Sequence, residues 1–259
     1  MVKLSVVIIT WNQCQKLERC LNSILKDTTS NNKRDYELII VDNASSDGTL
    51  LMLDRFSSDT KLIKNHKNRG VAPARNQGIG AANGEYIMML DDDAEIKRGC
   101  FKNIIKFMDS HEDCWCAGTK QLKPDGKLEY NARTFYDLKI ILARRIMFGR
   151  FMKKTIRGHL MMDWDHNSDR VVDWVAGASF IMKREAIKKI GVLDEKYFFG
   201  FEDVDWCYRV RLAGKKVFYI HNAVVIHHIQ GSSRKLASRK ALNHLLSAIR
   251  FYLKFKLKK

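Results

Sequence analysis

The sequence lacks the signatures of several common protein classes. Its six cysteines form no C-x-x-C pair and no zinc-type spacing with histidine, so Cys114-Trp115-Cys116 is only a weak metal signal. It has neither G-x-G-x-x-G nor a Walker lysine pattern, which argues against a dinucleotide site and a P-loop NTPase. No apolar run approaches a membrane span, and the opening MVKLSVVIIT is too short and too quickly polar for a signal peptide. These absences predict a reduced, cytoplasmic protein.

Acidic residues are few beside basic ones. The chain has 46 Lys and Arg against 29 Asp and Glu, which gives a net charge of +17. Residues 133–160 hold eight basic residues and one acid, and residues 233–259 hold nine and none, so +16 of the +17 lies in these two segments. Such a balance predicts attraction to nucleic acid, anionic lipid or phosphorylated substrates.

The first part of the chain repeats one pattern. Apolar, β-branched runs at 4–10, 36–41 and 86–90 predict buried strands that each end in a polar loop, and a short strand is expected at 61–65. Residues with helical spacing lie between these runs. The repeat predicts an α/β fold with a Rossmann-like half, in which the polar loops share the ligand-binding edge of a sheet.

Three carboxylates, Asp91, Asp92 and Asp93, follow the third of these strands directly. They repel one another unless a positive charge compensates them, and Mg²⁺ or Mn²⁺ suits carboxylate oxygens and is often shared with substrate phosphates. The alternative is a solvated acidic turn. A divalent cation at this strand end is therefore a hypothesis that depends on the rest of the chain.

Two later stretches also carry candidate chemistry. The sequence FEDVDW places three acids beside aromatic residues, where burial can maintain a base with a raised pKa. An ion-pair network with Arg209 and Arg211 on one helix is the alternative. Gly177 interrupts a strand pattern, which often marks the close approach of a ligand or of another backbone. His227 and His228 follow a final apolar run and could bind a metal, although paired histidines are more often surface or core residues.

The order of seven motifs is more specific than any one of them, and it resembles the family 2 glycosyltransferases of the GT-A fold, particularly their rhamnosyltransferase-like branch. The resemblance spans about residues 4–233. It implies a GT-A domain at 1–233 around one mixed, mainly parallel sheet, with a nucleotide-binding half (about 1–93) fused to an acceptor-binding half (94–233). Residues 234–259 would form a basic amphipathic tail. The motifs are TWN, VDNASSDGT, NRGVAPARNQGI, GEYIMMLDDD, WVAGASFIMKREA, LDEKYFFGFEDVDWCYR and HHIQGSS.

The resemblance also implies a role for individual residues around a nucleotide-sugar donor. Trp11 would stack on the base, Asp42 would accept a hydrogen bond from a pyrimidine N3–H, and Arg75 would approach the base or the diphosphate. Asp93 would bind Mg²⁺ or Mn²⁺ directly, and Asp91 would bind the ribose or the water shell of the metal. His227 or His228 would also contact the metal or the diphosphate; the motif spacing leaves this choice open, and we favour His227. The expected nucleotide-binding residues are Thr10, Trp11, Asn12, Asp42, Arg75, Asp91 and Asp92.

For the reaction itself, the resemblance implies inversion in one step with a single base, for which Asp203 is the candidate. The expected acceptor contacts are Trp174, Gly177, Ala178 and Glu202. The expected activity is metal-dependent transfer of a sugar, rhamnose in this branch, from a dTDP- or UDP-sugar to a hydroxyl of a cell-surface glycan or lipid-linked acceptor. UDP-N-acetylglucosamine and UDP-galactofuranose are alternative donors.

The two basic segments suggest where such an enzyme works. Residues 133–160 interleave basic and apolar side chains, as an interfacial helix does. In the tail, Leu242, Leu245, Leu246, Ile249 and Leu253 fall on one helical face, and its basic residues would meet anionic headgroups. Helices packed on the protein body are the alternative for both. We expect a peripheral protein at the cytoplasmic face of the membrane, and no nucleic-acid partner. The alternative of another class is a basic nucleic-acid-binding module, which would account for the charge but not for the acidic strand end.

Overall fold

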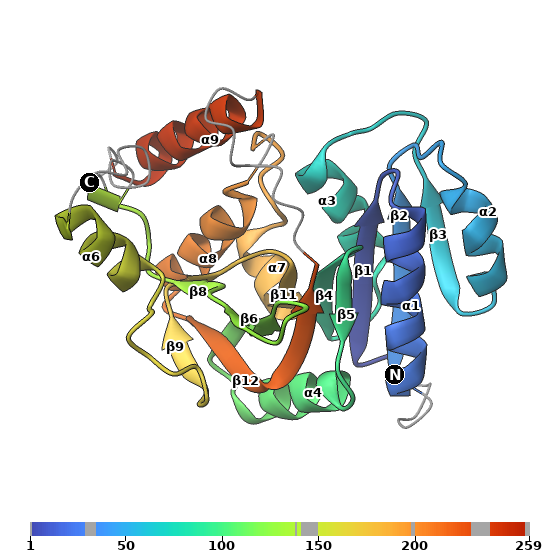
Figure 1. Ribbon diagram of the computed structural model, residues 1–259, viewed down its shortest axis with the longest axis horizontal. Helices are drawn as coiled ribbons and strands as arrows, with labels where there is room; N and C mark the ends of the chain where they lie inside the picture. Colours follow the sequence, from blue (N-terminus) through green and yellow to red (C-terminus); the bar gives the residue numbers. More distant parts are fainter. Residues whose placement is uncertain are drawn as a thin grey trace.

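The computed structural model describes residues 2–28, 35–137, 139–140, 150–197, 200–228 and 239–256. Within them one large mixed sheet has the strand order β3-β2-β1-β4-β11-β6-β12-β5, with β7 paired to β6 and β9 to β12. Figure 1 shows the first half of the chain, in blue and cyan, beside the second half in green to red. The predicted α/β fold with one mixed sheet is confirmed.

The first half follows the predicted strand–loop–helix repeat. Its four strands pair in parallel with one another, and they end within a residue or so of the predicted runs because each run stops at a polar loop. The elements are β1 (Leu4–Thr10), α1 (Cys14–Thr28), β2 (Tyr36–Asp42), α2 (Thr49–Leu53), the 3₁₀ helix η1 (Asp54–Phe56), β3 (Thr60–Lys64), α3 (Val71–Ala81) and β4 (Tyr86–Asp91).

The second half contributes every antiparallel pairing of the sheet, and β6 and β12 pair in parallel. The predicted interrupted strand near Gly177 is three short strands, because the chain changes partners there. The elements are β5 (Ala94–Ile96), α4 (Cys100–Ser110), β6 (Cys114–Leu122), β7 (Leu128–Glu129), β8 (Ala132–Arg133), α6 (Arg150–His159), β9 (Arg170–Val172), β10 (Trp174–Val175), β11 (Ser179–Lys183), α7 (Arg184–Ile190), α8 (Glu202–Leu212), β12 (Lys216–His227) and α9 (Arg239–Lys256).

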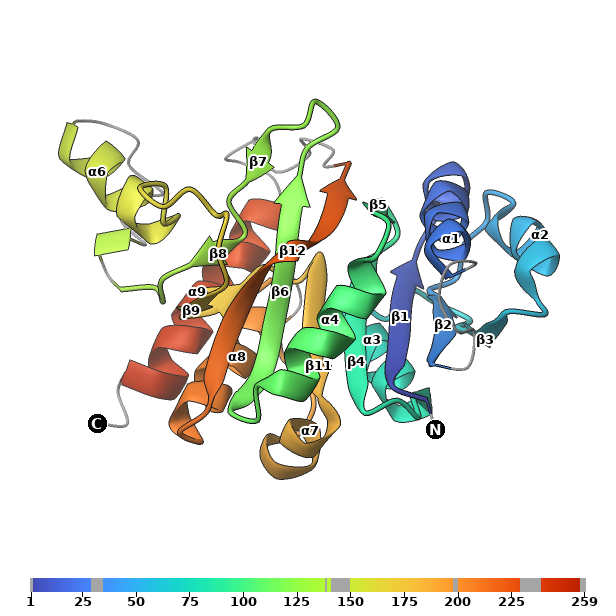
Figure 2. The ribbon, with the colours of Figure 1, turned by 90° about the horizontal axis from the view of Figure 1, so that it is seen from below.

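Helices cover both faces of the sheet (Figure 2). The apolar faces of α1 and α4 form one core with the sheet, and α3, α7, α8 and α9 form a second core on the other face. In α3 small residues allow close packing: a Cβ added at Gly78 would lie 2.1 Å from Cγ1 of Val7 on β1. This contact fixes the helix that carries Arg75 against the central strand.

The C-terminal helix α9 packs on α8, as both ribbon views show. Its buried face is formed by Ser247, Ala248 and Phe251, and the Phe251 ring lies 5.6 Å from that of Tyr208 on α8. Lys254 Nζ donates a hydrogen bond of 2.6 Å to the buried carboxylate of Asp205. The alternative of a helix packed on the body therefore describes this part of the tail.

The predicted apolar stripe of the tail is not the packing face. Leu246, Ile249 and Leu253 are 55%, 47% and 51% exposed, while the side chains of Leu242 and Leu245 lie outside the described part. Of the interleaved segment 133–160, residues 138 and 141–149 lie outside the described residues, and its last part forms α6 with exposed Lys153, Lys154 and Arg157. Among the described helices, none has the length and apolar character needed to cross a bilayer.

Candidate active site

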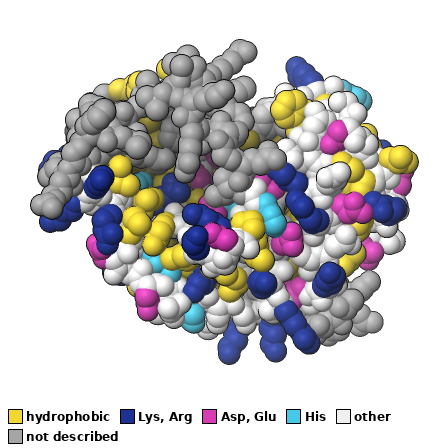
Figure 3. Space-filling model, in the orientation of Figure 1, with side chains coloured by type: hydrophobic (Ala, Val, Ile, Leu, Met, Phe, Trp, Pro, Cys, Tyr) yellow, Lys and Arg dark blue, Asp and Glu magenta, His cyan; other side chains and the backbone are white. Residues whose placement is uncertain are grey.

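The site lies at one edge of the sheet, where β1, β2 and β4 end in Thr10, Asp42 and Asp91. Because these strands are parallel, their polar ends meet at the edge where ligands bind in such folds. β12 reaches the same region with its last residue, His227, which pairs with Ala94 of β5. Figure 3 shows the molecule in the orientation of Figure 1; near the middle of this view, histidine and acidic side chains lie beside Lys or Arg side chains.

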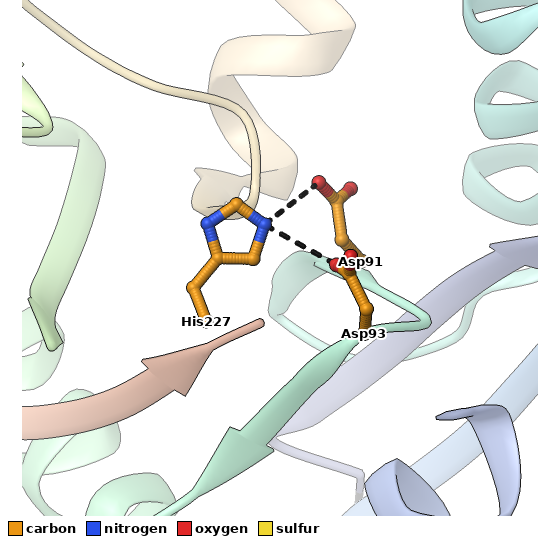
Figure 4. A group of neighbouring side chains, drawn as sticks. All are labelled: Asp91, Asp93 and His227. Carbon is orange, nitrogen blue, oxygen red and sulfur yellow. Dashed lines mark ion pairs between the residues drawn. The ribbon is translucent and has the colours of Figure 1, made fainter. Parts of the chain in front are cut away.

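Asp91, Asp93 and His227 form a group that could hold a metal ion, since one ligand atom from each lies within 4.8 Å of the others. Nε2 of His227 is 3.2 Å from Oδ1 of Asp93 and 3.9 Å from Oδ2 of Asp91 (Figure 4). His228 instead lies with its Nε2 2.8 Å from Oε1 of Glu95. Of the two candidate histidines, the structure thus places His227 with the acidic strand end. Two carboxylates and an imidazole fit a divalent cation such as Mn²⁺ or Mg²⁺ that keeps other positions for phosphate oxygens.

Two further residues border this group and were not predicted. Lys16, in the first turns of α1, has Nζ 3.6 Å from Oδ2 of Asp93. Glu129, at the end of β7, has Oε2 3.0 Å from Nδ1 of His227. The position of Lys16 shortly after the TWN motif was the only available signal. Glu129 had none, because it reaches the site through strand pairing and not through a motif.

These contacts set the charges of the group. Burial alone would raise the pKa of Asp93, but the hydrogen bond from His227 and the charges of His227 and Lys16 hold it below its ordinary value. Burial disfavours the imidazolium of His227, yet hydrogen bonds to Asp93 and Glu129 raise its pKa to about 10. For Asp92, burial raises the pKa to about 7, although the Thr10 hydroxyl donates a 2.7 Å hydrogen bond to its Oδ2.

The predicted nucleotide side of the site contains an unused acceptor. Asp42 is 1% exposed; its Oδ2 accepts a hydrogen bond from Ser45 N, and its Oδ1 has no partner within the described residues. Trp11 is 53% exposed at the same edge and remains available for stacking. Asn12 has a positive φ of 54°, and its Oδ1 accepts a hydrogen bond of 2.7 Å from Ser46 N. Asn12 therefore ties together the two loops that follow β1 and β2.

Arg75 lies deeper than a residue that only contacts the donor. Its guanidinium, 7% exposed, donates to Oδ1 of Asp91 at 2.7 Å, to Oε1 of Glu202 at 3.2 Å and to the carbonyl oxygen of Gly177 at 2.9 Å. Burying a guanidinium is unfavourable unless charges and hydrogen bonds compensate it. Arg75 thus joins the acidic strand end of the first half to the acidic helix of the second.

The two acids Glu202 and Asp203 occupy the first turn of α8. Phe201, which precedes them, has a φ of 75°, an uncommon backbone conformation for a bulky residue that is often retained at functional sites. Burial and the charge of Asp203 raise the pKa of Glu202 to about 7. Burial also raises the pKa of Asp203, although hydrogen bonds from the backbone of Val204 and Gly177 oppose the rise. As a whole residue Asp203 is half-buried, whereas Glu202 is buried.

The remaining predicted acceptor residues take different places. Gly177 lies between Arg75 and Asp203: its carbonyl oxygen accepts a hydrogen bond from Arg75, and its N–H donates one to Oδ2 of Asp203. The carbonyl oxygen of Ala178 accepts a hydrogen bond from the backbone N of Asp91. Trp174 is 3% exposed, and its Nε1 donates to the carbonyl oxygen of Thr134 within a buried aromatic cluster. The Gly231 and Ser232 loop of the last motif lies outside the described residues.

The fold and the grouping of acids around one sheet edge define a GT-A glycosyltransferase. The solved structure of GalNAc-T7 with UDP, GalNAc and Mn²⁺ superimposes with a TM-score of 0.70 at 18% identity, covering 96% of this chain and 48% of that one. The family model described as glycosyl transferase family 2 matches residues 5–191. The chain belongs to glycosyl transferase family 2 and is a glycosyltransferase enzyme.

Two curated relatives are rhamnosyltransferases. The N-acetylglucosaminyl-diphospho-decaprenol L-rhamnosyltransferase of Mycobacterium tuberculosis is 26% identical over 93% of this chain and 81% of its own length. Rhamnosyltransferase WbbL of Escherichia coli K12 is 24% identical over 95% of this chain and 91% of its own length. The predicted rhamnosyltransferase-like resemblance within the GT-A family is confirmed.

Proposed function

We propose that the enzyme transfers a sugar, rhamnose in the first instance, from a dTDP- or UDP-sugar to a hydroxyl of a lipid-linked or cell-surface glycan, with inversion. The observation that carries the proposal is the single buried Arg75, which holds Asp91 of the metal-binding group and Glu202 beside Asp203 on one edge. A one-step displacement needs a cation near the leaving diphosphate and a base near the attacking hydroxyl, and this edge offers candidates for both.

The nucleotide preference is proposed from Asp42. A buried carboxylate oxygen without a partner is unfavourable, and a pyrimidine N3–H would supply the missing donor. Uracil and thymine both present that group, so the proposal includes dTDP- and UDP-sugars. Exposed Trp11 would stack on the base, and Thr10 and Asn12 would border the base and ribose.

Each charged residue at the edge has a proposed role. Asp91, Asp93 and His227 would hold the ion, which when bound would neutralise charge on the diphosphate. Lys16 would assist at the same phosphates, given its position beside Asp93. Asp203 would accept the proton of the acceptor hydroxyl, for which its raised pKa and partial exposure suit it. Glu202, Gly177, Ala178 and Trp174 would shape the acceptor side, so the chain divides near Asp93 into a donor half and an acceptor half.

The test is a panel of nucleotide sugars with Mn²⁺ or Mg²⁺, read as release of nucleoside diphosphate in the presence of N-acetylglucosaminyl-diphospho-decaprenol. That acceptor is the one that the mycobacterial relative is named for. Turnover of dTDP-rhamnose that stops in excess EDTA and in Asp203→Asn supports the proposal. Turnover with UDP-N-acetylglucosamine or UDP-galactofuranose alone would keep the enzyme class and replace the donor.

The exposed stripe of α9 supports a position at the cytoplasmic face of the membrane. Leu246, Ile249 and Leu253 are exposed on a helix of the tail, and residues 233–259 hold nine Lys and Arg and no acid. Apolar side chains that enter the bilayer interface and basic side chains that meet anionic headgroups both favour binding to an anionic membrane. Sedimentation with vesicles containing phosphatidylglycerol should exceed sedimentation with neutral vesicles and should fall at high salt. Replacing the three residues with serine should abolish it, whereas equal binding to neutral vesicles would contradict the proposal.

A further inference from the structure

Glu129 makes a contact that the reaction, as described so far, does not use. Its Oε2 lies 3.0 Å from Nδ1 of His227, and the two side chains are only 14% and 13% exposed. On the other side of the same ring, Nε2 faces Asp93 at 3.2 Å and Asp91 at 3.9 Å. The imidazole is therefore held between one carboxylate behind it and two in front.

This arrangement determines which nitrogen can bind a cation. An ionised carboxylate accepts hydrogen bonds and donates none, so Nδ1 of His227 must carry the hydrogen that Glu129 accepts. Nε2, directed at Asp91 and Asp93, is then the nitrogen that would become the ligand, with a cation replacing the proton that it carries toward Asp93. A carboxylate behind a ligating histidine fixes the orientation of the ring and increases the basicity of the ligand.

The strand pairing places Glu129 there. β6 pairs with β12 on one side, where Leu122 faces Ile226, and with β7, where Gln121 faces Glu129. A tight turn at 123–127 joins β6 to β7; Lys123 N donates a hydrogen bond to the carbonyl oxygen of Lys127, and Gly126 N donates one to that of Lys123. The β6–β7 hairpin thus carries Glu129 back to the end of β12, and no sequence motif near Glu129 announces it.

We propose that Glu129 is a positioning residue that holds His227 in the orientation in which it completes the metal-binding group. This inference rests on the proposed function for the group of Asp91, Asp93 and His227. The next histidine on the chain offers an internal comparison, because His228 Nε2 also lies close to a carboxylate, Glu95 Oε1 at 2.8 Å, yet His228 is not part of the group.

The experiment measures Mn²⁺ binding to the full-length protein after chelation, by electron paramagnetic resonance of the free ion, without donor or acceptor. Glu129→Ala should weaken the Mn²⁺ Kd by about 10- to 100-fold, the usual effect of losing such an outer carboxylate. Glu129→Gln, which keeps an oxygen acceptor for the Nδ1 hydrogen, should lose clearly less. Glu95→Ala removes an equal charge from the neighbouring histidine and should leave the Kd unchanged.

A double-mutant cycle separates positioning from a general charge effect. If Glu129 acts through the ring, Glu129→Ala combined with His227→Ala should bind Mn²⁺ no worse than His227→Ala alone. Additive losses would show that Glu129 acts independently of His227 and would overturn the proposal. Urea midpoints of the single variants confirm that each one is folded, and Glu129→Gln keeps the test valid if Glu129→Ala does not fold.

Different results would contradict the positioning role of Glu129 and the metal-binding group itself. Wild-type affinity in Glu129→Ala together with a weakened His227→Ala overturns the positioning role and leaves the metal group in place. No effect of His227→Ala, or no Mn²⁺ binding by the wild-type protein, overturns the metal group itself and with it that part of the proposed function.

Discussion

The two acidic pairs on either side of Arg75 have the same chemistry and opposite electrostatics. Asp91 and Asp93 lie among His227, Lys16 and Arg75, and the pKa of Asp93 is held below its ordinary value despite burial. Burial raises the pKa of both Glu202 and Asp203 in spite of Arg75, and the charge of Asp203 adds to the rise for Glu202.

The difference indicates two kinds of task. A carboxylate that stays ionised because cations surround it suits a metal ligand, whereas one whose charged form is disfavoured suits a base that must gain a proton. Environments that push the pKa values of neighbouring acids apart often mark such assignments. Arg75 contacts both pairs and is the joint across which this contrast is maintained.

The largest expected effect comes from Asp93, the acid whose pKa is lowered. Asp93→Ala should reduce transfer by at least roughly 10³-fold, because the ion that offsets the diphosphate charge is worth several kcal/mol. Excess EDTA should do the same to the wild-type enzyme. Asp125→Ala, an acid on the β6–β7 turn paired only with nearby Lys127 among the described contacts, is the matched control. Full activity of Asp93→Ala would remove the metal assignment.

The other pair should respond in a different kinetic constant. Asp203→Asn keeps the shape and removes the base, so kcat should fall by roughly 10²–10⁴-fold while the Kd of the donor barely changes. Single-turnover rates and donor titrations separate the two quantities. If donor affinity collapsed while kcat persisted, Asp203 would be a binding residue and the contrast between the pairs would no longer hold.

The raised pKa of Glu202 should make the unfolding free energy depend on pH. Folding raises this pKa from 4.5 to about 7, so the contribution of Glu202 is fully present below about pH 4.5 and is lost as the pH rises through about 7. The difference corresponds to at most roughly 3 kcal/mol. Relative to Glu202→Gln, the wild-type protein should therefore lose unfolding free energy between pH 5 and pH 8.

Urea denaturation of both proteins at four pH values in this range measures that loss. Exposed Glu185, whose pKa is lowered by its hydrogen bond to Lys189, titrates below this window, so Glu185→Gln should run parallel to the wild type. A flat difference between Glu202→Gln and the wild type would mean that Glu202 is ionised throughout and resembles the other pair.

Much of the first half could be predicted from the sequence. Local patterns decide it, since each apolar run becomes a parallel strand and each polar loop falls at the same edge, which brings Thr10, Asp42 and Asp91 together. For the second half, the prediction of an acceptor-binding half with the adjacent acids Glu202 and Asp203 came from the order of the motifs. The expected roles of these residues remain proposals.

What the sequence could not reveal depends on tertiary contacts. The contact of Glu129 with His227 results from a hairpin and a shared neighbour strand, and the engagement of Arg75 by Glu202 spans residues far apart in the chain. In α9 the helical pattern identified an apolar stripe, of which Leu246, Ile249 and Leu253 are exposed. The helix packs on the protein through Ala248 and Phe251 instead. Periodicity identifies a face and does not say what that face contacts.

The smallest expected effect tests the joint itself. A Cβ added at Gly177 would lie 2.7 Å from an Nη of Arg75 and 3.4 Å from Oδ2 of Asp203. The guanidinium would have to move away from Asp91 or Glu202, so Gly177→Ala should lower the unfolding free energy by about 1–3 kcal/mol, as overpacking typically does. It should also reduce kcat without removing Mn²⁺ binding, since Asp93 and His227 do not contact Gly177 among the described contacts.

Gly80 of α3 provides the matched control, because a Cβ there meets nothing within 4 Å. Within a helix, Gly80→Ala should raise the unfolding free energy by roughly 0.5–1 kcal/mol and leave kcat unchanged. If the space around Arg75 is as restricted as the contacts indicate, urea denaturation should show a lower unfolding free energy for Gly177→Ala and a higher one for Gly80→Ala. Steady-state rates should fall only for Gly177→Ala. A Gly177→Ala enzyme that is as stable and active as the wild type would show that Arg75 can shift freely. The two acidic pairs would then be independent of each other. The lowered pKa of Asp93 and the raised pKa values of Glu202 and Asp203 would have to arise from their separate surroundings alone.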